Sequence, residues 1–248
     1  MNDQGTGGTV DRKTRLYTTL AAVFISALIL AEITGSKLIQ WQVTASLVFT
    51  MTMGVIPFPI TFIVTDIVNE YYGRKGIRFI TFLGMAMIGM VLLILQIDMR
   101  IPAAAISPVK DEAFNAVFSA SARIMVGSLL AYLIGQLVDI YVFHAIRERT
   151  GERYLWLRAT GSTFVSQFID SFVVLFVAFY GQLTTEQIIG VGVTNYLYKF
   201  AIAVLITPAL YLVHRLIDGY LGKDVAHAMM ETAHARGGVL NGRQGKEG

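Results

Sequence analysis

The sequence predicts an all-α membrane protein with six transmembrane helices, and three observations support this fold class. Of the 248 residues, 54% are hydrophobic and only 15% are charged, whereas an ordinary soluble domain is about 25% charged. The apolar residues gather in long runs, and a bilayer core of about 30 Å needs roughly 20 of them per helix. Lysine and arginine residues fall on alternate loops between these runs, which is the pattern that the positive-inside rule describes.

Six apolar runs are each long enough to cross a membrane. They cover residues 16–38, 43–72, 77–97, 117–144, 160–180 and 190–215. The second run is interrupted at Pro57–Pro59, and proline removes a backbone donor and clashes with the preceding turn. We expect a broken helix here with a cavity near Phe58, because irregular backbone in a membrane is tolerated only beside protein or water. A simple kink in a long, tilted helix is the alternative.

The distribution of basic residues places both termini in the cytoplasm. Basic clusters precede the first run and follow the second, fourth and sixth runs. They include Arg12 and Lys13, Arg74 and Lys75, Arg147 and Arg149, and Arg215 and Lys223. The composition also predicts a disordered cytoplasmic tail at 1–15, a transmembrane domain at 16–217 and a cytoplasmic tail at 218–248, in which a short helix precedes a disordered end.

Three polar stripes run along the predicted helices. A charge at the centre of a membrane helix costs about 2.5–3.5 kcal/mol on insertion scales, so carboxylates inside apolar runs are candidates for function. Because residues three and four apart share a helix face, the polar residues of one run line up. The stripes are Phe62, Asp66, Asn69 and Glu70; Ser128, Tyr132, Gln136 and Asp139; and Thr163, Ser166, Gln167 and Asp170. We expect the stripes to converge on a shared wet pocket.

A short pattern, Gln-x-x-Asp, occurs in two of these stripes. It appears in GQLVDIYVF at 135–143 and in SQFIDSFVV at 166–174. One interpretation is that these amides and carboxylates hydrogen-bond one helix to the next. The other is that they face a ligand, since an amide alone would suffice to bridge two helices.

Further ionisable residues lie in the first and last runs. Asn195 and Lys199 share one face of the sixth run, where Lys199 either forms a fixed ion pair with an acid or contacts the substrate. These two roles stay open. Glu32 and Lys37 lie near the end of the first run, and we expect them at the membrane interface.

The sequence lacks the motifs of several protein classes. No cysteine is present, which excludes disulfides, iron–sulfur clusters and thiol catalysis. Neither a Gly-x-x-x-x-Gly-Lys-Ser/Thr loop nor a His-Glu-x-x-His motif occurs, so we expect neither ATP hydrolysis nor a zinc centre. No basic stripe suited to nucleic acid is visible. We therefore expect a protein that is not an enzyme and needs no metal or cofactor.

The polar side chains of the stripes suit one kind of ligand. Carboxylates accept hydrogen bonds, whereas Asn and Gln both donate and accept. Together they fit a flat molecule with several N–H donors and a carbonyl, such as a purine-like base. One aspartate would bind an amino group and the adjacent ring N–H through two parallel bonds, and an aromatic side chain would cover the ring. The residues therefore predict a small-molecule carrier in the lipid bilayer.

Several stretches resemble a known family. They are FIVTDIVNEYYGRKG, GQLVDIYVF, SQFIDSFVV and NYLYKFAIAVLITP, and the family is that of the queuosine precursor transporters, also called the VUT or vitamin-uptake-transporter-like family. The resemblance covers about residues 16–217. It implies six helices and import of a 7-deazaguanine base, such as 7-cyano-7-deazaguanine, across the bacterial inner membrane for salvage into tRNA queuosine.

The polar residues and the resemblance together indicate where the base would bind, but they do not decide which carboxylate grips it. The candidate substrate-binding residues are Asp66, Asn69, Glu70, Gln136, Asp139, Gln167, Asp170, Asn195 and Lys199. Asp170 with Gln167 is the first choice, because both lie near the middle of a run, and Asp139 with Gln136 is the second.

An alternative function is the substrate-capture subunit of an ATP-driven vitamin-type importer, because six short helices without an ATPase suit that class. Proton coupling through the carboxylates and facilitated diffusion both stay open as driving forces. The sequence does not predict whether the chain forms a homo-oligomer.

Overall fold

The computed structural model describes residues 11–42, 44, 48–150 and 155–243. Within the helices, the side chains at 139–140, 143–150, 155–164, 166–167, 203 and 234–243 lie outside this description. The chain forms two compact units. Unit 1 comprises Met1–Leu28, Pro59–Gly84 and Ala203–Gly248, and unit 2 comprises Ile29–Phe58 and Met85–Ile202.

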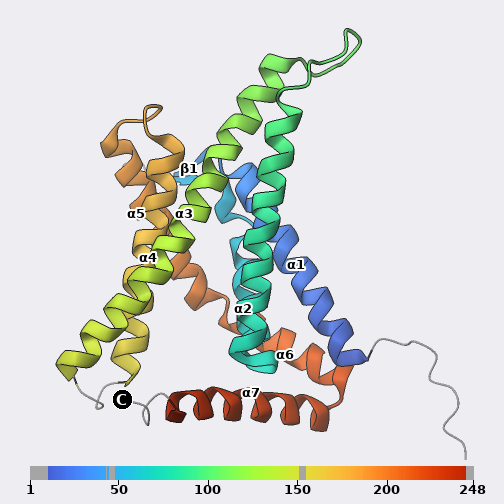
Figure 1. Ribbon diagram of the computed structural model, residues 1–248, viewed down its shortest axis with the longest axis vertical. Helices are drawn as coiled ribbons and strands as arrows, with labels where there is room; N and C mark the ends of the chain where they lie inside the picture. The colour runs from blue at the N-terminus through green and yellow to red at the C-terminus, as the bar shows by residue number, and fades with distance from the viewer. Residues whose placement is uncertain (1–10, 43, 45–47, 151–154, 244–248) are drawn as a thin grey trace, which may run out of the picture. The chain divides into compact units, whose positions relative to one another are not determined.

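Helices make up most of the described chain, as the sequence predicts (Figure 1). They are α1 (Arg12–Thr34), α2 (Phe58–Asp98), α3 (Asp111–Thr150), α4 (Leu155–Phe179), α5 (Thr185–Leu205), α6 (Thr207–Leu221) and α7 (Lys223–Arg243). The other elements are strands β1 (Leu38–Gln42) and β2 (Val48–Thr52) and the 3-10 turn η1 (Met53–Val55).

Several helices are suited to a membrane. Among the described residues, Arg12–Thr34, Met53–Asp98 and Asp111–Val138 are long and apolar enough to cross one, and α5 with α6 adds a fourth if the pair is one span. These helices indicate a multi-pass membrane protein. The stretch Met53–Asp98 contains a break at Gly73, which falls between the second and third predicted runs. The count of six spans and the cytoplasmic termini stay predictions.

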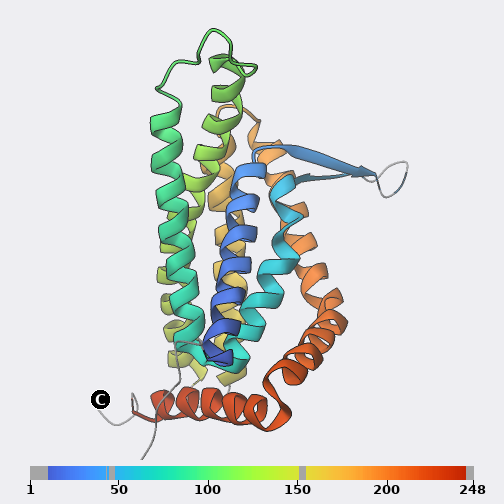
Figure 2. The same cartoon turned by 90° about the vertical axis from the view of Figure 1, so that its right-hand side faces the viewer.

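Residues 38–42 and 48–52 depart from the all-α prediction, because they pair as the two strands of an antiparallel hairpin. β1 pairs with β2 in a register that places Leu38 opposite Thr52 and Trp41 opposite Phe49. Figure 2 shows this hairpin extending sideways from the end of α1. The two strands are rich in β-branched and aromatic residues, which favour a pleated surface.

The prolines of the PFP sequence begin a helix instead of interrupting one. α2 starts at Phe58, with Pro57 at the N-cap and Pro59 in the first turn. Proline fits there because the first N–H groups of a helix have no partner within the helix. The second predicted run, 43–72, is therefore helical only from Phe58 onward, since β2 and η1 precede it.

Unit 2 is held together by the packing of α3 against α4, which lie side by side in Figure 1. At Gly127 of α3, a Cβ atom would lie only 2.9 Å from the carbonyl oxygen of Val174 in α4. The missing side chain thus lets the two helices approach closely, as small residues do between membrane helices. A buried cluster of α3, α4 and α5 residues continues this contact. It contains Ile124, Leu175, Ala178, Phe179, Ile188 and Val191.

Gly127→Ala is expected to destabilise unit 2, although alanine is the better helix former. The new Cβ would meet the backbone of Val174, and overpacking of this kind costs about 1–3 kcal/mol. Gly89→Ala in α2 is the matched control, because no described atom lies within 4 Å of its Cβ position, and it should stabilise its helix by roughly 0.5–1 kcal/mol. Thermal unfolding in detergent measures both variants. A melting temperature that rises equally in the two would contradict the close packing of α3 on α4.

Unit 1 packs the first part of α1 against α2. The buried residues of this contact are Ala21, Phe24, Val64, Val68 and Ile80. Within α2, Gly73 leaves the helical conformation with φ 68° and ψ −171°, which glycine adopts more readily than other residues. Figure 2 shows α7 lying across the start of α1 and the turn inside α2.

The C-terminal helix α7 packs on the other helices of unit 1 through its first half. Ala226 is buried, and Met229 and Met230 contact the cluster that includes Ile67 and Ile217. α7 has 21 residues, so the described helix extends into the stretch that the sequence predicts to be a disordered end. Residues 1–10 and 244–248, which belong to the tails predicted to be disordered, lie outside the described residues, and the domain boundaries stay a prediction.

Candidate functional site

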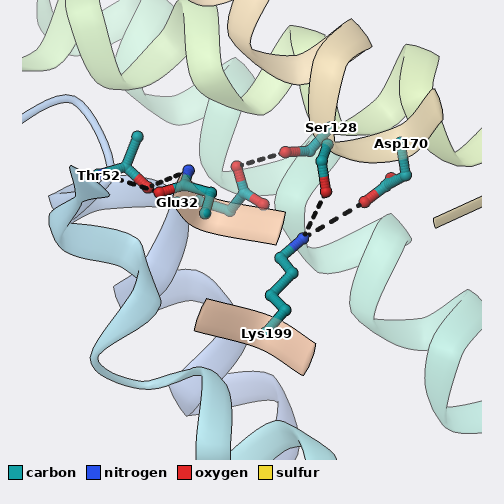
Figure 3. Close-up of polar contacts among 7 residues, drawn as sticks. Glu32, Thr52, Ser128, Asp170 and Lys199 are labelled. Carbon is teal, nitrogen blue, oxygen red and sulfur yellow. Dashed lines mark hydrogen bonds and ion pairs between the residues drawn. The ribbon is translucent and has the colours of Figure 1, made fainter. Parts of the chain in front are cut away.

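A group of polar side chains lies inside unit 2. This group, termed the polar cluster, consists of Glu32, Thr52, Ser128, Asp170, Ser171, Asn195 and Lys199. Its members come from α1, β2, α3, α4 and α5, so that five segments distant in the sequence contribute to it. Figure 3 shows Glu32 reaching toward Ser128 and Lys199 reaching toward Asp170.

Glu32 is the most buried carboxylate of the cluster, with 7% of its surface exposed. The hydroxyl of Ser128 donates a hydrogen bond of 2.9 Å to its Oε2 atom. No ion pair of Glu32 with a Lys, Arg or His is present among the described residues. A buried carboxylate with one neutral hydrogen-bond donor is costly for folding, which makes a functional role the simplest reason for its presence.

The end of α1 is fixed against α3, and this contact positions Glu32. Ser121 lies two turns before Ser128 on the same side of α3, and its hydroxyl donates 2.7 Å to the carbonyl oxygen of Ile33. The last carbonyls of a helix lack partners within the helix, so Ser121 satisfies one of them. On the other side, a Cβ at Gly54 would lie 2.7 Å from the carbonyl of Ala31, and glycine allows the chain after β2 to pass this close to α1.

Lys199 of α5 reaches two residues of α4. Its Nζ atom donates a hydrogen bond of 3.3 Å to the hydroxyl of Ser171 and lies 3.7 Å from the Oδ2 atom of Asp170. The same Nζ atom is 5.0 Å from the centre of the Phe58 ring, within the range of a cation–π contact. The side chains of Lys199 and Asp170 are 23% and 33% exposed, so this ion pair is partly desolvated.

Asn195 joins α5 to the hairpin. Its amide NH₂ group donates a hydrogen bond of 3.1 Å to the hydroxyl of Thr52, and its Oδ1 atom accepts one of 3.2 Å from the backbone N–H of Thr52. Both residues are buried. Asn195 is one turn before Lys199, so the face of α5 that holds the hairpin also carries the lysine.

Replacing Asn195 with leucine is expected to loosen the hairpin. The change removes both hydrogen bonds and leaves the N–H of Thr52 buried without this partner, which costs about 1–3 kcal/mol. Thr194→Val is the control, because the Thr194 hydroxyl bonds only to Gly190 within its own helix among the described residues. Thermal unfolding and proteolysis of β1–β2 measure the effect. Equal protease resistance of Asn195→Leu and wild type would show that the pair does not hold the hairpin.

A pocket of about 590 Å³ lies beside the hairpin in unit 2. Its lining comes from β1, β2, the loop before α5 and the first turns of α5. The lining residues are Leu38, Gln40, Val48, Thr50, Leu183, Gln187, Gly190, Val191 and Thr194. Thr50 and Thr52 project from the same face of β2, because side chains alternate along a strand. The pocket therefore adjoins the part of the hairpin that Asn195 holds.

The structure brings together only part of the predicted site. Asp170, Asn195 and Lys199 belong to the polar cluster. Gln136 is exposed on α3. The side chains of Asp139 and Gln167 lie outside the described residues, so the Gln-x-x-Asp pairs stay predictions.

The three candidates of the first polar stripe belong to unit 1. Asp66 and Asn69 are exposed on α2. The Oε2 atom of Glu70 lies 2.8 Å from Nε2 of His214 in α6. Tyr71, the next residue, donates 3.0 Å to Asp218 and lies 3.0 Å from Nδ1 of the same histidine. The motif around Glu70 thus connects α2 to α6.

The expected interfacial position of Glu32 stays a prediction, while the structure shows its side chain buried within unit 2. The sequence shows only that Glu32 lies near the end of an apolar run. It does not show that the chain after α1 folds back as a hairpin, or that the turn η1 after this hairpin packs on the last turn of α1. The signal that identifies Glu32 is simpler, namely an acid inside an otherwise apolar helix. Ser128 belongs to the second polar stripe of the sequence, whereas Ser171 and Thr52 carry no such signal, since hydroxyl residues are common in membrane helices.

Comparison with known proteins decides the family. A family model described as "Putative vitamin uptake transporter" matches residues 52–213, which is more than half of the chain. The chain belongs to this transporter family. The resemblance seen in the sequence is thereby confirmed. The region that matches the vitamin uptake transporter model contains all members of the polar cluster except Glu32.

The chain is also similar to three curated proteins. The chain is 33% identical over 169 residues to the "Probable queuosine precursor transporter" of Bacillus subtilis (strain 168), which covers 68% of this chain and 73% of the relative. It is 27% identical over 228 residues to the "Queuosine precursor transporter" of Escherichia coli (strain K12). This match covers 86% of this chain and 95% of the relative. It is also 27% identical over 169 residues to the "Probable queuosine precursor transporter" of Haemophilus influenzae, covering 66% and 68%. No solved structure matches the chain.

Proposed function

We propose that this protein imports a queuosine precursor, a 7-deazaguanine base such as 7-cyano-7-deazaguanine, across the bacterial inner membrane, and that the polar cluster binds the base. Membership of the vitamin uptake transporter family and the names of three relatives support the transport function. The apolar helices suit a membrane carrier. The observation that carries the proposed site is the burial of Glu32 in a cluster that also holds the Lys199–Asp170 pair.

The cluster offers the hydrogen-bond partners that such a base requires. A 7-deazaguanine presents an amino group, an adjacent ring N–H and a carbonyl. Glu32 would accept from the first two in parallel bonds, since its carboxylate has about four acceptor positions and Ser128 uses one. Lys199 would donate to the carbonyl, because its ammonium carries three hydrogens and Ser171 accepts one.

Phe58 would supply an apolar surface for the ring. Its centre is 5.0 Å from the Nζ atom of Lys199, so a base that binds this ammonium lies within reach of the phenylalanine. Aromatic side chains favour stacked or edge contacts with flat rings. Phe58 is also the first residue of α2, which places it at a helix end instead of inside a helix.

This arrangement predicts strong discrimination between bases. Hypoxanthine lacks the amino group, so one acceptor position of Glu32 would stay unpaired in its complex. A site built around a hydrogen-bond donor rejects analogues that lack it, because its buried polar groups then lose their partner. Hydrogen bonds to charged groups contribute about 1.5–3 kcal/mol each, which corresponds to roughly a tenfold to hundredfold loss of affinity.

The pocket beside the hairpin is the proposed approach to the cluster. Its volume of about 590 Å³ falls in the range of small-molecule pockets, about 300–1,000 Å³. Thr50 of β2 lines it, and Thr52 on the same face of the strand belongs to the cluster. Gln40 and Gln187 give the pocket amide groups that both donate and accept hydrogen bonds.

The test is uptake of labelled 7-cyano-7-deazaguanine by liposomes that contain only the purified chain, without ATP. We expect uptake that unlabelled 7-cyano-7-deazaguanine suppresses and hypoxanthine does not. Binding of the base without uptake would favour the substrate-capture subunit of an ATP-driven importer. Failure to bind any deazaguanine would contradict the proposal. A second arm with an uncoupler separates proton coupling from facilitated diffusion, because only the former loses uptake when the proton gradient collapses.

A further inference from the structure

Unit 1 contains a second pocket, of about 310 Å³, at the break in α2. Three segments distant in the sequence form it: the start of α1, the turn at Gly73 and the middle of α7. The lining residues are Lys13, Tyr71, Tyr72, Gly73, Arg74, Lys75, Ala228, Met229, Thr232 and Ala233. Figure 2 shows α7 crossing this end of unit 1. The proposed base site uses none of these residues.

The charged residues of this pocket are all basic. Lys13, Arg74 and Lys75 line it, and its lining as described contains no Asp or Glu. None of the three has an ion pair with a carboxylate among the described residues. Among the described residues, three positive charges and no carboxylate thus line the hollow, and the nearby Asp218 is engaged by the hydroxyl of Tyr71, which together favour an anionic ligand.

The walls of the pocket are held in place before any ligand binds. The hydroxyl of Tyr72 donates 2.7 Å to the carbonyl oxygen of Lys13, which connects α2 to the start of α1. Tyr71 is fixed by its bond to Asp218 of α6. Ala233 of α7 lies only 3.4 Å from the position of a Cβ at Gly73, so glycine permits both the backbone turn and the close approach of α7. A preformed site loses less freedom on binding.

From this geometry we propose that the pocket binds the phosphate group of an anionic phospholipid headgroup. Lysine and arginine suit phosphate through charge-assisted hydrogen bonds, and arginine does so with two parallel bonds. The pocket also has an apolar part, formed by Met229, Ala228 and the tyrosine rings, which a glycerol backbone would contact. A free phosphate ion would use the cations alone. The break at Gly73 separates two apolar helical segments, which is where a membrane surface is expected.

The experiment measures binding of phosphatidylglycerol and of phosphatidylcholine to the full purified chain by native mass spectrometry. We expect phosphatidylglycerol to bind more tightly, and Arg74→Gln/Lys75→Gln to weaken it at least tenfold, since each basic residue near a membrane surface contributes about fivefold. Arg78→Gln is the matched control, because Arg78 is also exposed on α2 but does not line the pocket. Thr232→Glu, which adds an acid at an exposed position of α7, is expected to weaken binding without removing a cation.

Inorganic phosphate is the second probe and separates the two sources of the anion. If phosphate displaces phosphatidylglycerol only at a concentration far above that of the lipid, the pocket binds a lipid headgroup. If phosphate displaces the lipid at an equal concentration, the lipid assignment is wrong and the pocket binds a soluble phosphate. Equal binding of the two lipids, or an Arg78→Gln effect as large as that of the double variant, would overturn the proposal. Binding of 7-cyano-7-deazaguanine by the same variants should stay unchanged, so failure here is distinct from failure of the proposed transport function.

Discussion

Glu32→Gln is expected to reduce both the affinity for 7-cyano-7-deazaguanine and its uptake by about tenfold to hundredfold. Glutamine keeps the shape of the side chain and can still accept the hydrogen bond of Ser128. It lacks the charge and the second acceptor oxygen, so one of the two parallel bonds to the base is lost. Hydrogen bonds to a charged group contribute about 1.5–3 kcal/mol, which sets the size of the effect.

The measurement compares uptake and the dissociation constant at matched protein levels. Glu186→Gln is the control, because Glu186 is an exposed acid in the first turn of α5. Ser128→Ala gives a second comparison, since it removes only the neutral donor and should have a smaller effect than Glu32→Gln. Unchanged uptake by Glu32→Gln, or an equal loss in Glu186→Gln, would remove Glu32 from the site.

The second large effect is expected from the pair of Lys199 and Asp170. Lys199→Gln leaves Asp170 without the cation 3.7 Å away, and Asp170→Asn does the reverse. Each single variant should lose stability by about 1–3 kcal/mol, because a partly desolvated group is left without its partner. The double variant Asp170→Asn/Lys199→Gln should recover most of that stability, since neither charge remains.

Base binding in this double variant decides between the two roles left open for Lys199. If the ammonium contacts the base carbonyl, the double variant melts near the wild-type temperature and still binds at least tenfold more weakly. Such a split between stability and affinity is what a double-mutant cycle isolates. Recovery of both stability and binding would mean that Lys199 serves as a fixed ion pair and that the carbonyl is bound elsewhere.

Much of the helical architecture can be predicted from the sequence. A membrane helix needs an apolar run of a certain length, and basic residues flank such runs on one side of the bilayer. The face shared by Asn195 and Lys199 follows from helical spacing, and both side chains are indeed in the polar cluster. The pairing of residues 38–42 with 48–52 could not be predicted in this way. β2 falls inside a predicted apolar run and most of β1 falls between two runs, and periodicity alone does not separate a short strand from part of a helix.

The site was only partly predictable, since helical spacing gives a face but not the partner on that face. Glu70 illustrates this, because His214 of α6 lies 144 positions further along the chain. No feature of the sequence near Glu70 predicts the 2.8 Å contact between its Oε2 atom and Nε2 of His214. Glu32 illustrates the converse. Its acid was visible in the sequence, but its burial depends on the hairpin end that packs against α1. Long-range packing therefore decides which acids reach a shared site.

A structure of the protein with 7-cyano-7-deazaguanine bound tests the proposed base site most directly. We expect the ring N–H and amino group of the base to lie about 3 Å from the carboxylate of Glu32 and its carbonyl to face Lys199. A base bound instead at Asp66, Asn69 and Glu70 of unit 1, with Glu32 still held by Ser128 alone, would contradict this proposal.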